Sequence, residues 1–170
     1  MKRTMLIVLC AITLGSCGLN QKKAVDYNNG LVKIQQETGL NIVNAENQIG
    51  AAIASRDSAK AGQLMRSAAT FVGTTQKRLD SLNFNGDDFG MKAALEETLT
   101  FMNQFYTKDY QQWLSIQFAA NPDPAELQKA QALLMGDSEK GKNLDAKFSE
   151  AQEKFAKSHN IKLIRQNLLK

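Results

Sequence analysis

The single histidine is the first place to look for catalytic or metal chemistry. His159 is the only imidazole among the 170 residues. A ferritin-like di-metal bundle needs a Glu-x-x-His motif on each of two helices, and a c-type haem needs Cys-x-x-Cys-His. Neither motif occurs in this sequence. Because His159 follows a helical pattern near the C-terminus, where a capping or solvated imidazole is ordinary, we expect it to be structural.

Groups of carboxylates and amides are the second candidate. The segment 83–88 reads Asn-Phe-Asn-Gly-Asp-Asp and offers oxygen atoms, but it does not follow the residue order of an EF-hand loop. Its composition is typical of a turn that caps the next helix. Glu96, Glu97, Glu150 and Glu153 have lysines at helical neighbours, which favours a solvated face over an acid pair in a cleft. We therefore expect no metal site, no cofactor and no catalytic residue, and so no enzyme.

Six of the twelve Phe, Tyr and Trp side chains lie in one stretch of the chain. They are Phe101, Phe105, Tyr106, Tyr110, Trp113 and Phe118. Rings at helical spacing are usually core residues, and this interpretation is favoured. The alternative is an exposed patch for a partner or an apolar ligand, formed by Tyr106, Tyr110 and Trp113.

The N-terminus has the three parts of a secretory signal. Lys2 and Arg3 are followed by an apolar run over 5–14, which is shorter than the roughly 20 residues of a spanning helix, and then by Gly15-Ser16-Cys17. The sequence Leu14-Gly15-Ser16-Cys17 resembles the lipobox of bacterial lipoproteins. The resemblance implies that the chain is cut before Cys17, that the cysteine thiol receives lipid such as palmitate, and that the new amino group is acylated. Residues 1–16 are then a signal peptide.

The residues after Cys17 give an expectation about the anchor and its membrane. Residues 17–23 form the predicted lipid anchor and a short polar tether. Asp after the cysteine retains enteric lipoproteins in the inner membrane, whereas here that residue is Gly18. We therefore expect delivery to the outer membrane, with the periplasmic and the surface face both left open.

Composition excludes several classes of partner. The chain has 21 Lys and Arg against 17 Asp and Glu, for a net charge of +4, and loss of Lys2 and Arg3 would lower it by two. These interspersed charges give no basic stripe for nucleic acid. Because Cys10 lies in the predicted signal peptide and Cys17 is the predicted lipid site, we expect neither a disulfide nor a free thiol in the folded part.

Apolar residues recur at helical spacing through the rest of the chain. Four helices are predicted, over 23–54, 58–82, 88–118 and 124–157. Short connections make neighbours antiparallel, so residues 24–170 are expected to form an all-α, up-down-up-down four-helix bundle with a short C-terminal tail. Asp123 is the predicted N-cap of the fourth helix, which is either continuous across 136–141 or broken near 135–138.

The lipobox, the segment 26–32 and the helical remainder together resemble small surface lipoproteins of Bacteroidota and spirochaetes, a group without an assigned activity. The resemblance implies nothing catalytic. The first functional hypothesis is a binding or scaffolding module on the envelope, held on the membrane by lipid and directed at a protein partner. The alternative is a carrier of a small apolar or cofactor ligand inside the bundle.

Overall fold

The computed structural model describes residues 7–12 and 18–167. Its elements are β1 (Ile7–Ile12), α1 (Leu19–Ala54), α2 (Ser58–Asp80), α3 (Met91–Gln104), the π-helix η1 (Phe105–Asp109), α4 (Tyr110–Gln117), α5 (Pro124–Ser158) and β2 (Lys162–Asn167). The elements α3, η1 and α4 follow one another without a gap and form the third predicted helix. The predicted all-α bundle is therefore confirmed for the described part of the chain.

Aspartate caps set the starts of α2 and α5. The carboxylate of Asp57 accepts a hydrogen bond from the Lys60 N–H at 2.9 Å, and Asp123 accepts one from the Ala125 N–H at 2.8 Å. Pro124 occupies the first position of α5, where its missing N–H costs nothing. Because α5 runs unbroken from Pro124 to Ser158, the continuous-helix interpretation is confirmed and the break near 135–138 is wrong.

Two predicted starts differ from the structure. α1 begins at Leu19 rather than near residue 23, so most of the predicted polar tether is already helical. α3 begins at Met91 rather than at 88, after Gly90 with a φ of 79°. Asp88 still caps this helix, since its carboxylate accepts hydrogen bonds from the N–H groups of Gly90 and Lys92.

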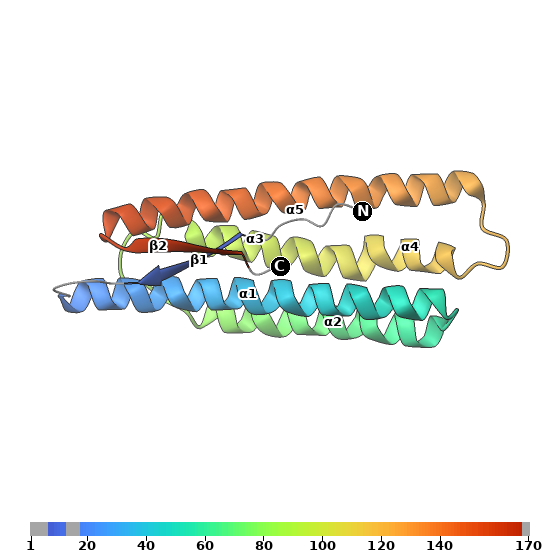
Figure 1. Cartoon of the computed structure of the whole chain (residues 1–170), viewed down its shortest axis with the longest axis horizontal. Helices are drawn as coiled ribbons and strands as arrows, with labels where there is room; N and C mark the ends of the chain where they lie inside the picture. The colour runs from blue at the N-terminus through green and yellow to red at the C-terminus, as the bar shows by residue number, and fades with distance from the viewer. Residues whose placement is uncertain (1–6, 13–17, 168–170) are drawn as a thin grey trace.

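Successive helical segments run back and forth along one long axis (Figure 1). The colours change from left to right along α1 and along α3 to α4, and from right to left along α2 and α5. α1 packs against α2, α2 against α3, and α3 against α5. With 36 residues, α1 is about 54 Å long at 1.5 Å per residue.

The apolar stripes meet in two core clusters, one toward each end of this axis. The proximal cluster lies where α1 begins and α5 ends, and the distal cluster lies where α1 turns into α2. The proximal cluster contains Ala24, Tyr27, Leu31, Ile34, Val72, Leu79, Met91, Ala94, Leu95, Leu99, Phe148, Ala151, Phe155, Ala156 and Ile161. The distal cluster contains Ala45, Ile49, Ala52, Ala61, Met65, Ala68, Tyr106, Tyr110 and Leu114.

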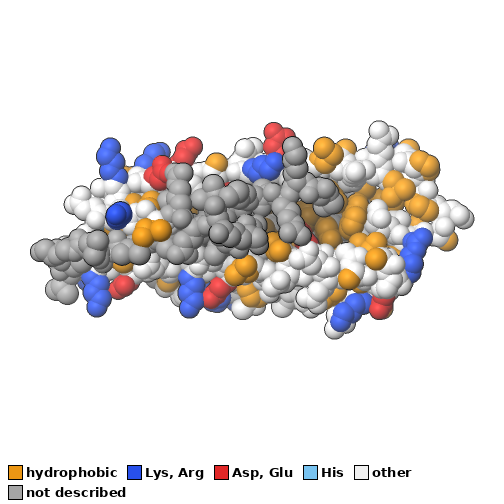
Figure 2. Space-filling view, viewed as in Figure 1, with side chains coloured by type: hydrophobic (Ala, Val, Ile, Leu, Met, Phe, Trp, Pro, Cys, Tyr) orange, Lys and Arg blue, Asp and Glu red, His pale blue; other side chains and the backbone are white. Residues whose placement is uncertain are grey.

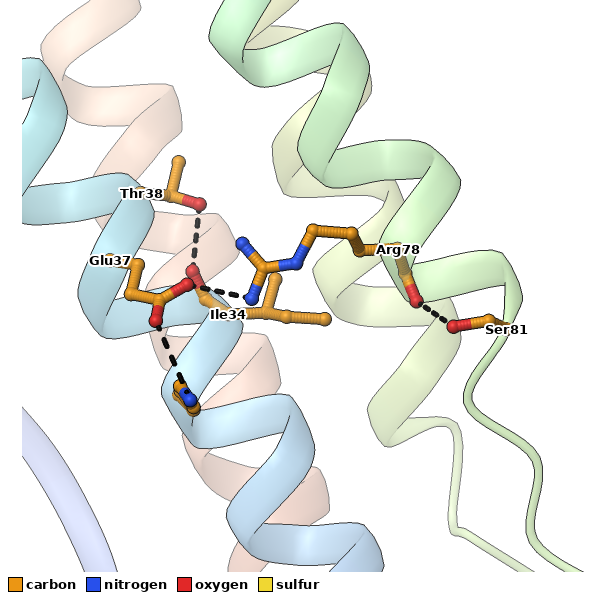
Figure 3. Close-up of polar contacts among 6 residues, drawn as sticks. Ile34, Glu37, Thr38, Arg78 and Ser81 are labelled. Atoms are coloured by element: carbon orange, nitrogen blue, oxygen red, sulfur yellow. Dashed lines mark hydrogen bonds and ion pairs between the residues drawn. The ribbon is translucent and has the colours of Figure 1, made fainter.

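A polar contact joins α1 and α2 beside the proximal cluster (Figure 3). Arg78 of α2 reaches across to Glu37 of α1, with Nη2 and Oε2 2.7 Å apart. The Thr38 hydroxyl donates to the carbonyl of Ile34 at 2.7 Å, so this buried side chain is satisfied within its own helix. Because both charged groups of the ion pair are solvent-exposed, the pair adds at most about 1 kcal/mol and mainly fixes how the two helices are aligned.

A two-stranded antiparallel sheet, formed by segments far apart in the sequence, packs on α1 and α5. β1 pairs with β2 in a register that runs from Ile7 opposite Asn167 to Ile12 opposite Lys162. The sequence pattern indicated no strand, and this expectation is wrong for these two segments. The physical reason is that a short apolar run has no period that distinguishes a strand from another buried element.

Candidate functional site

The three residues of the predicted binding patch lie together, but two of them are buried. Tyr106 is 1% exposed and Tyr110 is 7% exposed, whereas Trp113 is partly buried at the edge of the distal cluster. The ring centroids of Tyr106 and Tyr110 are 5.6 Å apart, and those of Tyr110 and Trp113 are 5.0 Å apart. These distances are those of packed aromatic pairs. The core interpretation therefore holds for both tyrosines, and only Trp113 can contribute its edge to a surface.

A π-helical turn brings these rings inward. η1 covers Phe105–Asp109, and π-helical turns insert an extra residue and are frequent at functional sites. The sequence carried no distinct signal for this turn, because two successive four-residue steps also occur in the regular helix α1, from Ile34 to Thr38 and from Thr38 to Ile42.

The polar end of the aromatic cluster is not fully satisfied. Among the residues that the structure describes, the buried Tyr106 hydroxyl forms no hydrogen bond of regular geometry. The carboxylate of Glu46 lies beside it and interacts with it both electrostatically and as a weak acceptor. Burial, and then this negative charge, raise the pKa of Tyr106 and of Tyr110. Both phenols therefore stay protonated and cannot act as bases.

Glu46 itself is a residue that the sequence did not single out. Desolvation beside the rings raises the pKa of its carboxyl group above the ordinary value of 4.5. A perturbed carboxyl in a cleft can indicate a functional site. Here, however, its neighbours are two protonated phenols, and this arrangement offers neither a nucleophile nor a second acid.

Buried polar side chains also join α1 to α5, and the sequence gave no indication of them. The Gln152 side-chain N–H donates to the Asn28 side-chain oxygen at 2.9 Å, and both residues are at most 1% exposed. Farther along, Gln35 and Asp145 line a small void of about 10 Å³. Burial raises the pKa of Asp145, and the facing Gln35 amide offsets part of this effect. A void of this size holds about one water molecule.

The other sequence candidates have structural roles. The ring of His159 packs 4.5 Å from Phe155 and 5.2 Å from Phe84, between centroids. The Asp88 carboxylate, considered for calcium, accepts the Tyr27 hydroxyl at 2.9 Å in addition to its capping bonds. Glu97 pairs with Lys147. Within residues 7–12 and 18–167, no three His, Cys, Asp or Glu side chains are grouped so that they could hold a metal ion.

The lipobox and Cys17 lie outside the described residues, so the structure does not place the predicted lipid site. Among the helices of residues 18–167, none combines the length and the hydropathy needed to cross a bilayer. No family model, curated protein or solved structure matches this chain.

Proposed function

We propose that this chain is the precursor of a lipid-anchored protein of the bacterial cell envelope, expected at the outer membrane. The N-terminal sequence supports this, because two cations and an apolar run precede Leu14-Gly15-Ser16-Cys17, which resembles a lipobox. Processing there would remove residues 1–16 and leave lipid on Cys17. Each buried CH₂ contributes about 0.8 kcal/mol to membrane binding, so two or three acyl chains make attachment effectively permanent.

The start of α1 determines how such a protein would meet the bilayer. Only Gly18 separates Cys17 from the first helical residue, Leu19. A single intervening residue gives the bundle little freedom to move away from its lipid. The proximal cluster would then lie next to the headgroups, and the distal cluster would lie at the far end of a helix about 54 Å long.

At that far end the protein is proposed to work as a non-enzymatic binding or scaffolding module. Two large apolar side chains are exposed on the distal half of α5, since Leu133 is 37% and Met135 is 70% exposed. Figure 2 shows hydrophobic side chains on the face toward the viewer, at the end away from β1 and β2. Contiguous exposed apolar surface marks sites that contact other proteins, and these two side chains are proposed as part of such a site.

The alternative, a carrier of a small apolar or cofactor ligand, has less support. Ligand pockets usually measure about 300–1,000 Å³. The enclosed void beside Asp145 has about 10 Å³, and a more open groove between α1 and α2, lined by polar side chains such as Asn41 and Gln48, has about 240 Å³. Neither space can enclose a cofactor, so the geometry favours binding at the surface.

The two cysteines provide a matched test of the anchor. In cells fed a labelled fatty acid, Cys17→Ala should abolish both label and membrane attachment, because the acceptor thiol is gone. Cys10→Ala should keep both, since Cys10 lies in the predicted signal peptide. A mature-size Cys17→Ala protein that remains in the membrane fraction without lipid would disprove the anchor.

A further inference from the structure

The two-stranded sheet of β1 and β2 lies between α1 and α5. β1 lies against α1 and β2 lies against α5 (Figure 1). The two strands are paired over six residues each, from Ile7 opposite Asn167 to Ile12 opposite Lys162. The two strands therefore bridge α1 and α5, which also contact each other directly through the buried Asn28–Gln152 hydrogen bond.

α1 has a row of buried side chains that faces α5 at Asn28 and Gln35, and β1 packs along the same helix. Asn28, Val32 and Gln35 recur at the spacing of one helix face and are 0%, 3% and 7% exposed. Val32 nevertheless belongs to neither core cluster. At the base of β2, Ile161 is part of the proximal cluster and Leu163 packs against it, so the start of β2 is held on the bundle independently of β1.

Processing before Cys17 would separate the two strands. The inference rests on the proposed function, because β1 lies within residues 1–16. Cleavage would remove β1, leave the backbone N–H and C=O groups that it had paired on β2 without partners, and expose the part of α1 along which β1 packs. An edge of this kind is a template for another extended chain.

We propose that, in the mature protein, an extended and uncharged apolar segment of a partner protein takes the place of β1. It pairs antiparallel with residues 162–167 and packs along α1 where β1 packs in the precursor. This is strand addition, in which the backbone supplies affinity and the side-chain types supply selectivity. The surface is therefore a peptide-binding site that the precursor fills with its own leader.

The chemistry of the two strands favours a partner over a second copy of this chain. β1 reads Ile-Val-Leu-Cys-Ala-Ile and has no charged residue, whereas β2 contains Lys162 and Arg165. Pairing two copies of β2 would bring four cations together, and like charges across a strand pair are destabilising. An uncharged segment avoids this repulsion.

Amide hydrogen exchange at residues 162–167 tests the proposal on three samples. These are the uncleaved Cys17→Ala precursor, the mature lipoprotein in detergent, and the mature lipoprotein with the peptide Ile-Val-Leu-Ser-Ala-Ile. We expect protection in the precursor, at least tenfold faster exchange in the mature protein, and protection regained with the peptide. A control peptide with proline at its third position should have no effect, because it cannot complete the ladder.

A protein variant tests the strand pairing, and the measured mass of each sample shows whether residues 1–16 have been removed. Ile164→Pro in the mature protein should abolish the peptide effect while its helical circular dichroism is unchanged. Equal protection with and without β1, or no response to the peptide, would overturn the proposal. Protection that rises with protein concentration would replace the partner by a second copy, and protection only in vesicles would replace it by lipid. If the mass shows that residues 1–16 are retained, the proposed function fails instead.

Discussion

The two core clusters are built by the same helical segments, yet they are filled by different side chains. In the proximal cluster Phe148 and Phe155 are almost fully buried, and the Tyr27 hydroxyl donates to Asp88 at 2.9 Å. In the distal cluster the small side chains of α1 and α2 face tyrosines. Each half contains one buried hydroxyl without a regular hydrogen bond among the described residues, that of Thr75 beside the proximal cluster and that of Tyr106 in the distal cluster. A buried hydroxyl without a partner costs about 1–3 kcal/mol.

The difference lies in what each half adds to the common helical frame. The distal half contains the π-helix η1 and the exposed Leu133 and Met135, whereas the exposed apolar side chain of the proximal end is Phe89. In an anchored protein, the distal half would be the one that points away from the membrane.

The largest expected effect is the loss of Phe155 from the proximal cluster. The ring is 0% exposed and packs against Tyr27, Phe84 and His159. Phe155→Ala should lower the free energy of unfolding by about 3–5 kcal/mol, through lost transfer energy and a residual cavity. Trp113→Ala should lower the free energy of unfolding by less, about 2 kcal/mol, because this ring is only partly buried.

Urea unfolding followed by circular dichroism measures both values. Total stabilities of small domains are about 5–15 kcal/mol, so a loss of this size leaves a marginal fold. The Phe155→Ala titration is therefore carried out at reduced temperature. A larger loss for Trp113→Ala than for Phe155→Ala would reverse the proposed ranking of the two clusters.

A smaller effect separates the two clusters by its sign. Tyr27→Phe removes a hydroxyl that donates to Asp88 and should cost about 1 kcal/mol. Tyr106→Phe removes a hydroxyl without a regular hydrogen bond and should lie between no change and about 1 kcal/mol of stabilisation. The same urea titration decides, and equal losses in both variants would mean that Tyr106 has a good partner in solution.

The smallest expected effect concerns the polar contact between α1 and α5. Burial raises the pKa of Asp145 above its ordinary value of 3.8, so the folded state holds this proton more tightly than the unfolded state. Ionised Asp145 therefore destabilises the fold at pH 7, and the penalty disappears as pH falls through the raised pKa. Asp145→Asn should stabilise the protein at pH 7 and lose this advantage by about pH 4. An advantage that does not change with pH would contradict the burial of this carboxyl.

Helical periodicity predicted most of the fold because each segment carries one continuous apolar stripe. Leu31, Ile49, Val72, Leu95 and Phe148 were all expected inside and all are buried. Capping chemistry placed the starts of α2 and α5, since Asp57 and Asp123 act locally on the N–H groups that follow them. Local signals of this kind need no knowledge of the neighbouring helices.

The polar contacts between helices could not be predicted in this way. Asn28, Gln35 and Gln152 are hydrophilic residues, and the approach of α5 to α1 explains their burial. The weakly bonded hydroxyl of Tyr106 likewise depends on what α1 presents to it, namely Glu46. The lipid site remains a prediction, because Cys17 lies outside the residues that the structure describes.

Mass spectrometry of the N-terminal peptide, from protein purified out of the membrane of a bacterial host, tests the central claim most directly. The claim is that lipid on Cys17 carries a helical bundle whose distal cluster points away from the bilayer. The predicted result is a chain that begins at Cys17, with the thiol lipidated and the amino group acylated. A chain that retains residues 1–16 or begins elsewhere, with an unmodified thiol at Cys17, would contradict it.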